Sequence, residues 1–124
     1  MSSFSAVSPL KIDRKVRQSC RVFCLSGILD LFSLPTFHTV LEQYIGGSEE
    51  ESKNCVLDLT CVEQIDYSAL SALVDLGQKI QQCGGTLQVV GSPHITRVIT
   101  SACLGQILSL QPSLDAAIVN LEKR

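Results

Sequence analysis

One short segment of the sequence carries the residues best placed for chemistry. It reads Ile65-Asp66-Tyr67-Ser68-Ala69-Leu70 and lies between an apolar run that predicts a buried strand and an amphipathic stretch that predicts a helix. Proteins of the α/β class place their sites where strand ends lead into helix N-termini. Ser68 stands where the helix should begin, so a phosphate on its hydroxyl would meet unpaired backbone N–H groups and the positive end of the helix dipole. The segment could therefore accept a phosphoserine without unfolding the helix.

The same residues also have a purely structural explanation. Serine and aspartate are preferred N-cap residues, because their side-chain oxygens accept hydrogen bonds from the first N–H groups of a helix. On these residues alone, capping by Ser68 is the simpler interpretation, and Asp66 is an equally good candidate for the cap. Both alternatives stay open at this point.

The residue patterns typical of enzymes do not occur in the sequence. There is no Gly-x-Ser-x-Gly segment, and the glycine pairs at 46–47 and 84–85 belong to neither a Walker loop nor a Gly-x-Gly-x-x-Gly loop. His94 follows Pro93 at an expected helix start and has no visible partner for general-base catalysis. Both histidines, His38 and His94, lie apart from any cysteine cluster, and no Cys-x-x-Cys pair occurs. We therefore predict no catalytic residue, no metal site and no cofactor.

The six cysteines indicate a reducing compartment. An even number is compatible with disulfides in a secreted protein, but the first nine residues lack the basic and apolar regions of a signal peptide. A chain of this size can form a core without disulfides. A cysteine nucleophile is a further alternative, although only Cys20, beside Arg21, has a basic neighbour. Reduced cysteine behaves as a small hydrophobe, so we expect a cytoplasmic protein in which most of these residues are reduced and buried: Cys20, Cys24, Cys55, Cys61, Cys83 and Cys103.

Composition limits the classes of function that remain. The chain has 124 residues, a net charge of −2, 45% hydrophobic and 18% charged residues, which is typical of one globular domain with an aliphatic core. A nucleic-acid-binding protein should have a clear basic excess, and no apolar run approaches the roughly 20 residues of a membrane span. Within the first 21 residues, however, five basic residues accompany one acidic residue. A solvated strand face is the simpler interpretation of this basic segment, and a docking surface for an acidic partner is the alternative.

Strand-like and helix-like patterns alternate along the chain. Period-two or continuously apolar runs predict strands at 10–17, 21–26, 55–60, 86–90 and 107–110, and helical periodicity covers 34–45, 70–80, 95–102 and 114–121. The order ββαβαβαβα predicts a single α/β domain with a mixed, mostly parallel sheet of about five strands and about four helices. The first strand should be an antiparallel edge strand with its charged face in solvent. We expect residues 1–9 to be a flexible segment, residues 10–124 to form the domain, and residues 48–53 to form an acidic loop.

Four segments together resemble the STAS domain, in the form found in anti-sigma factor antagonists. They are Leu25-Ser26-Gly27-Ile28-Leu29-Asp30, Val56-Leu57-Asp58-Leu59-Thr60, residues 65–70, and Gly84-Gly85-Thr86-Leu87-Gln88-Val89-Val90-Gly91. They match the order and spacing of the family's Gly-x-Leu-Asp, Leu-Asp-Leu-Ser and Asp-Ser-Ser/Thr-Gly-Leu patterns. The resemblance covers about residues 10–121 and implies the STAS fold.

The resemblance also implies a function and a site. Ser68 would be phosphorylated by a serine kinase that doubles as an anti-sigma factor, which supplies the ATP and Mg²⁺, and a PP2C-type phosphatase would reset the protein. Asp30 and Asp66 would lie near Ser68 at the partner-binding surface. Two departures from the family pattern stand beside the serine: Tyr67 replaces a hydroxylic residue and Ala69 replaces glycine. The expected function is thus a bacterial phospho-switch in transcription regulation. The alternative is a STAS subunit of a stress-signalling or lipid-transport complex whose Ser68 is not phosphorylated.

Overall fold

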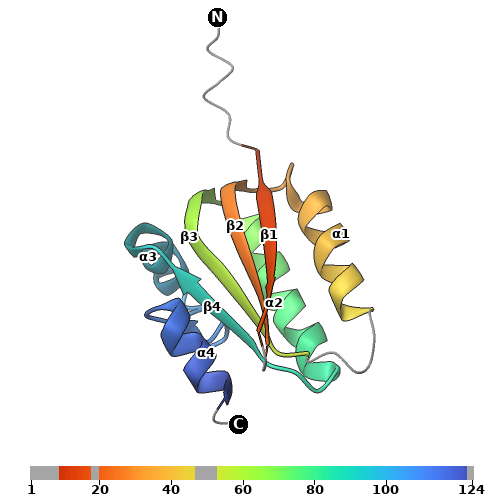
Figure 1. Cartoon of the computed structure of the whole chain (residues 1–124). Coiled ribbons are helices and arrows are strands. Elements are labelled where there is room, and N and C mark those ends of the chain that lie inside the picture. The colour runs from red at the N-terminus through yellow and green to blue at the C-terminus, as the bar shows by residue number, and fades with distance from the viewer. Residues whose placement is uncertain (1–8, 18–19, 47–52, 123–124) are drawn as a thin grey trace, which may run out of the picture.

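The computed structural model describes residues 9–17, 20–46 and 53–122 as one α/β domain (Figure 1). The five strands are β1 (Lys11–Val16), β2 (Arg21–Leu29), β3 (Cys55–Ile65), β4 (Leu87–Gly91) and β5 (Leu110–Gln111). The four helices are α1 (Leu34–Ile45), α2 (Tyr67–Gln82), α3 (Pro93–Ser101) and α4 (Leu114–Glu122). The strands lie in the order β1-β2-β3-β4-β5, and only β1 runs antiparallel to its neighbour. The predicted element order and mixed sheet are confirmed.

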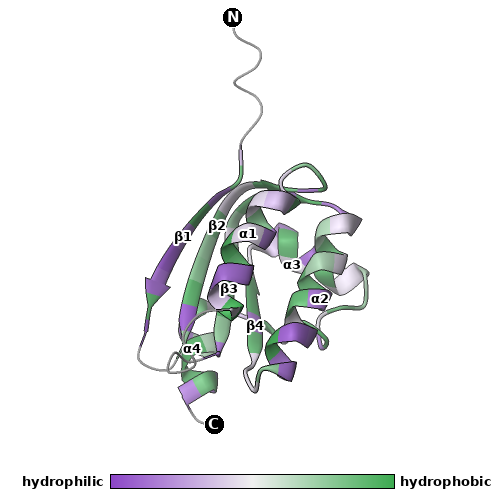
Figure 2. Ribbon diagram, turned by 90° about the vertical axis from the view of Figure 1, so that its right-hand side faces the viewer, coloured by the Kyte–Doolittle hydropathy of each residue, from purple (hydrophilic) through white to green (hydrophobic). Residues whose placement is uncertain are grey.

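The helices divide the core into two unequal parts. Side chains of α1, α2 and α3 pack against one face of the sheet and form the larger cluster, in which Phe23 and Tyr44 make an edge-to-face contact with ring centroids 5.3 Å apart. On the other face, α4 alone packs against β2, β3 and β4 through Ala117 and Leu121. Figure 2 shows this arrangement, with the hydrophobic strands between the two helix layers. The core is mainly aliphatic, as expected from the scarcity of aromatic residues.

β1 is the predicted edge strand. Its apolar side chains, however, are less buried than the alternation of apolar and charged residues predicted. Ile12 is half-buried and packs on the larger core, whereas Val16 is 64% exposed. Lys11, Asp13 and Lys15 face solvent, which gives β1 its hydrophilic colour in Figure 2. Charge along an edge strand opposes pairing with another sheet. This supports the simpler interpretation of the basic segment, a solvated strand face.

Three strand boundaries differ from the expectation by more than one residue. β2 ends at Leu29 instead of residue 26. The strand that begins at Cys55 continues to Ile65, because β3 pairs with β2 along its whole length through two register shifts. Its second half is largely exposed, so the apolar run that marks a buried strand stops before the strand does. The last strand is only Leu110–Gln111, and the preceding residues, with Ile107 63% exposed, form turns.

The cysteines are more exposed than predicted. Cys20 and Cys55 are buried and Cys24 is half-buried, but three others are exposed: Cys61, Cys83 and Cys103. Cys61 lies on the exposed half of β3, and Cys103 follows α3 in a left-handed conformation (φ 60°) instead of extending its apolar face. The prediction that most cysteines are core residues is therefore wrong, although no disulfide joins any of these six described residues.

Two expectations concern residues outside the described ranges. They are the flexible segment 1–9 except Pro9 and the acidic loop 48–53 except Lys53.

Candidate functional site

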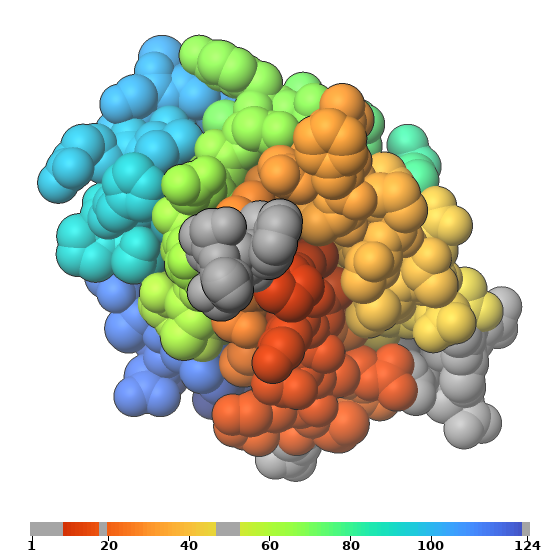
Figure 3. Space-filling view, turned by 90° about the horizontal axis from the view of Figure 1, so that it is seen from above, coloured from red at the N-terminus to blue at the C-terminus, as the bar shows by residue number. Residues whose placement is uncertain are grey.

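The carboxyl ends of β2 and β3 bring the two predicted aspartates to neighbouring positions. The strands are parallel and Leu29 pairs with Ile65, so Asp30 and Asp66 each follow the last residue of their strand. The chain then turns into α1 after Asp30 and into α2 after Asp66. Seen from above, the surface of the β2–α1 turn lies against the start of α2 (Figure 3). This register places Asp30 next to Asp66, two residues before Ser68.

Asp66, and not Ser68, is the N-cap of α2. Its Oδ1 accepts a hydrogen bond from the Ala69 N–H at 2.9 Å, and its backbone is extended as a cap requires. Its Oδ2 accepts a second bond from the Leu31 N–H at 3.1 Å. One carboxylate thus caps α2 and holds the β2–α1 turn beside it.

Asp30 orders the turn that leads into α1. Its Oδ1 accepts hydrogen bonds from the N–H groups of Phe32 (3.0 Å) and Ser33 (3.1 Å). Ser33 stands at the N-cap position of α1, but its hydroxyl makes no cap bond. The hydroxyl instead accepts from the Asp30 N–H and donates to the Ile28 carbonyl, both at 2.9 Å. The two aspartates therefore order the backbone of the β2–α1 turn and of the start of α2, where Ser68 lies.

Ser68 occupies the second position of α2 and is half-buried. Among the described residues, none makes a hydrogen bond with its hydroxyl, and none accepts one from the N–H groups of Tyr67 or Ser68. The first N–H groups of a helix have no partner within the helix, and here only that of Ala69 is taken by the cap. Two backbone donors therefore remain beside the Ser68 hydroxyl, where they could bind a phosphate.

Exposed apolar side chains stand on the β2–α1 turn and at the first position of α2. Tyr67 is 83% exposed, Phe32 is 89% exposed and Leu31 is 58% exposed. Large apolar side chains gathered at one exposed place are typical of protein-binding surfaces. Ala69, the other predicted contact residue, is completely buried, so its side chain takes no direct part in this surface.

Leu31 and Phe32 are site residues that the sequence reasoning missed. Their signal was available, because both are apolar, lie between a predicted strand and a predicted helix, and precede Pro35 in the first turn of that helix. They fit neither the strand nor the helix pattern, which places them in an exposed turn.

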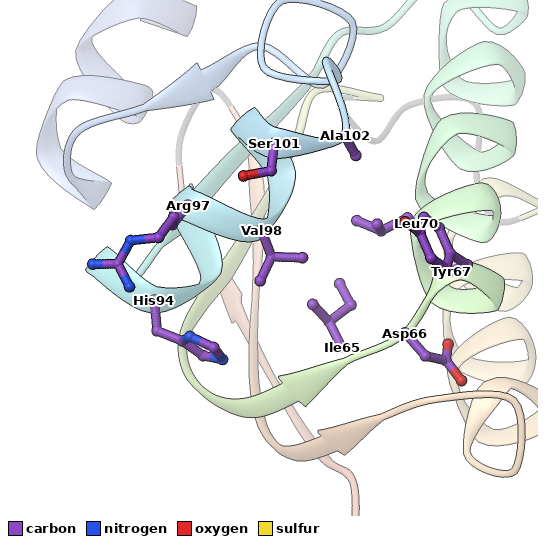
Figure 4. A pocket seen from close by; sticks show the side chains of 9 residues that line it. All are labelled: Ile65, Asp66, Tyr67, Leu70, His94, Arg97, Val98, Ser101 and Ala102. Atoms are coloured by element: carbon purple, nitrogen blue, oxygen red, sulfur yellow. The ribbon is translucent and has the colours of Figure 1, made fainter.

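A groove of about 510 Å³ lies between the start of α2 and α3 (Figure 4). Ile65, Leu70 and Val98 supply apolar lining, and His94 and Arg97 extend from α3 at its rim. The Asp66 carboxylate across the groove is already bonded to two backbone N–H groups, so it does not orient His94 as an acid–base pair. Over the described ranges, no group of three or more potential ligands is arranged to hold a metal ion. Nor does any helix there combine the length and apolar character needed to cross a membrane.

Solved structures share this fold. An anti-sigma factor antagonist from Mycobacterium paratuberculosis superimposes with a TM-score of 0.80 at 22% identity, over 91% of this chain and 94% of that one. SpoIIAA, an anti-sigma factor antagonist, matches in its unphosphorylated form (TM-score 0.73, 14% identity, 93% and 97% of the two chains). The Bacillus cell fate determinant SpoIIAA matches in its phosphorylated form (TM-score 0.66, 15% identity, 90% and 98%). The murine anion transporter Slc26a9 matches 98% of this chain with 23% of its own (TM-score 0.76, 13% identity).

The family assignment rests on the sequence. No curated protein sequence is significantly similar to the whole chain. The sequence profile of the STAS domain, however, matches residues 11–117, from the first residue of β1 into α4. At 13–22% identity the solved structures show the common fold and no more. The chain belongs to the STAS domain family.

Proposed function

We propose that the protein is an anti-sigma factor antagonist that works as a phospho-switch at Ser68. In its unphosphorylated form it binds a serine kinase that is also an anti-sigma factor, and phosphorylation releases it. The observation that carries the proposal is the Ser68 hydroxyl, which has no hydrogen-bond partner among the described residues and lies beside two unpaired N–H groups. A serine that served only as the cap would have its oxygen engaged.

The transfer step uses groups that the kinase provides. The Ser68 Oγ attacks the γ-phosphorus of ATP, its proton passes to a base of the kinase, and the bond between phosphorus and the leaving oxygen of ADP breaks. Asp66 is a poor base for this step, because both carboxylate oxygens accept backbone hydrogen bonds. The kinase supplies ATP and Mg²⁺, a PP2C-type phosphatase removes the phosphate, and the cycle takes place in the bacterial cytoplasm without contact to nucleic acid.

Phosphorylation is expected to change binding and to leave the fold intact. The phosphate adds about −1.5 to −2 charge, which the N-terminus of α2 stabilises. On the partner side, the same charge follows the exposed Tyr67 directly, at the helix start to which Asp66 ties the turn with the exposed Leu31 and Phe32. A partner that covers this apolar surface would have to bury the phosphate. Support comes from SpoIIAA, which retains this fold in its phosphorylated form.

The proposal is tested with the cognate kinase and Mg-ATP. The protein should gain one phosphate, mapped to Ser68 by mass spectrometry, and Ser68→Ala should gain none. Tyr67→Phe is the matched control, since it removes the neighbouring hydroxyl and should still be phosphorylated. A phosphate on Tyr67 or Ser71 would contradict the assignment.

Binding is the second readout. Phosphorylated protein, or Ser68→Asp as a weaker mimic, should bind the kinase at least tenfold less tightly, about 1.4 kcal/mol. Equal affinity of both folded forms would eliminate the switch.

The alternative is a STAS subunit that is not phosphorylated, and the structural similarity to part of murine Slc26a9 favours keeping it. Intact mass of the protein from its own cells separates the two functions, because only the switch predicts a phosphorylated fraction that maps to Ser68.

A further inference from the structure

Gln88 is a polar residue without a hydrogen-bond partner among the described residues. It lies on β4 and is completely buried, and neither its Oε1 nor its Nε2 bonds to any residue of the described ranges. Its neighbour across the sheet is Val56 on β3, which in turn pairs with Val22 on β2. A buried amide without partners is costly, because it has lost its hydrogen bonds to water and gained none in the protein.

The face of the sheet that contains Gln88 is the one that α4 covers. Val56 lies across from Gln88 on β3, and Val90 follows Gln88 by two residues on β4. Both valines pack in the smaller core cluster with Ala117 and Leu121 of α4. Side chains alternate between the faces of a strand, so Gln88 points to the same side as Val90. In Figure 1, α4 lies beside β4, away from α1 and α2.

α4 is short and depends on its packing against the sheet. It is nine residues long, and only Ala117 and Leu121 are completely buried. A helix of this length is not stable alone in water and depends on its packing. The surface on which it packs includes the Gln88 amide. When α4 is docked, this amide is desolvated, which lowers the stability of the docked state; when α4 is undocked, water can bind the amide and this cost disappears.

We propose that α4 undocks from the sheet as a unit while the remaining domain stays folded, and that the buried Gln88 amide promotes this opening. The opening hydrates Gln88 and exposes a strip of sheet that includes Val22, Val56 and Val90. It also uncovers Cys20, which is buried in the same cluster. α4 is therefore a releasable cover on the face of the sheet opposite α1 and α2, and this property does not depend on phosphorylation of Ser68.

Two buried cysteines provide the test and its internal control. Cys20 lies in the cluster beneath α4, and Cys55 lies in the larger core on the other side of the sheet. Native protein is treated with iodoacetamide, and each residue is followed by peptide mass spectrometry. Cys20 should be alkylated at least tenfold faster than Cys55. Low urea should accelerate Cys55 steeply and Cys20 only slightly, because undocking one helix exposes much less surface than unfolding the domain.

Gln88→Met connects the opening to the amide. Methionine has a similar shape and needs no hydrogen bond, so alkylation of Cys20 should slow about tenfold. Gln78→Met, at an exposed position of α2, is the matched control and should leave the rate unchanged. In the wild-type protein, hydrogen exchange provides a readout that needs no substitution: the amides of α4 should exchange together and faster than those of α2.

Three results would overturn the proposal. Equal alkylation rates of Cys20 and Cys55 would show that no opening of α4 precedes global unfolding. Fast alkylation of Cys20 that Gln88→Met leaves unchanged would show that the buried amide does not promote the opening, and α4 amides that exchange no faster than those of α2 would show that the helix is not released.

Discussion

The hydrogen bonds at the start of α2 predict that Asp66→Ala destabilises the protein and that Ser68→Ala does not. Asp66 caps α2 through Ala69, and loss of an N-cap costs typically about 1 kcal/mol. It also accepts the Leu31 N–H, a bond at an exposed turn that contributes roughly 0.5–1.5 kcal/mol. The free energy of unfolding should therefore fall by about 2 kcal/mol in Asp66→Ala. Ser68→Ala removes no hydrogen bond to a described residue, and its effect should stay within about 0.5 kcal/mol.

Urea denaturation followed by circular dichroism at pH 7 measures these differences. Asp66→Asn should fall between wild type and Asp66→Ala, because its single side-chain oxygen can keep the Ala69 bond but not the Leu31 bond as well. Asp75→Asn is the control, since Asp75 is exposed on the same helix. The slope of the free energy against urea should not change, because the exposed surface on unfolding stays the same. A loss in Ser68→Ala as large as in Asp66→Ala would refute the reasoning, since it would make Ser68 the cap.

Thiol reactivity and two glycines give further predictions. At pH 8, DTNB should modify three cysteines rapidly, and reducing agent should not change the melting temperature; the reactive residues are Cys61, Cys83 and Cys103. Cys24 should react more slowly than these, because desolvation by burial raises its pKa and lowers its thiolate fraction, and the difference should narrow as pH rises. Equal rates at pH 8 would contradict this. Gly77→Ala should stabilise the protein by about 1 kcal/mol, since the added Cβ would meet Leu87 at an ordinary 3.4 Å. Gly85→Ala should destabilise it by at least about 1 kcal/mol, because its Cβ would overlap the backbone before β3; the same sign for both variants in urea denaturation would refute this.

The elements that the sequence predicted well are those in which burial and secondary structure coincide. β4 is buried along most of its length and bounded by glycines, and α2 has one apolar face, so each pattern begins and ends near its element. The pattern fails where a strand extends beyond the core. The second half of β3 is held by pairing with β2 and not by burial, so hydrophobicity carries no sign of it. The same cause explains Cys61, which was assigned to the core because it follows an apolar run.

The candidate site was predictable in its residues but not in its hydrogen bonds. Both Asp66 and Ser68 are good caps by residue type, and the choice between them depends on where the extended backbone of β3 gives way to helix. That boundary is set by the pairing of Leu29 with Ile65, a contact between distant parts of the chain. Gly77 shows a related limit. A glycine inside a helix usually indicates close packing against a neighbouring element, yet the 3.4 Å approach of an added Cβ to Leu87 leaves room for a methyl group.

The bond from Leu31 to Asp66 gives the proposed switch a physical route from the serine to the partner surface. Leu31 and Phe32 are exposed on a turn that Asp66 holds against the start of α2, and Ser68 is two residues from Asp66. A phosphate on Ser68 would compete with the Asp66 carboxylate for the N-terminus of α2. Both groups are anions, and both are attracted by the N–H groups and the positive dipole at this end of the helix. Repulsion between them would weaken the hold of Asp66 on the turn without unfolding the helix, because the phosphate itself can replace the lost cap. The consequence is specific to this geometry: phosphorylation should displace the backbone amide NMR signals of Leu31 and Phe32 more than those of residues equally distant along α2.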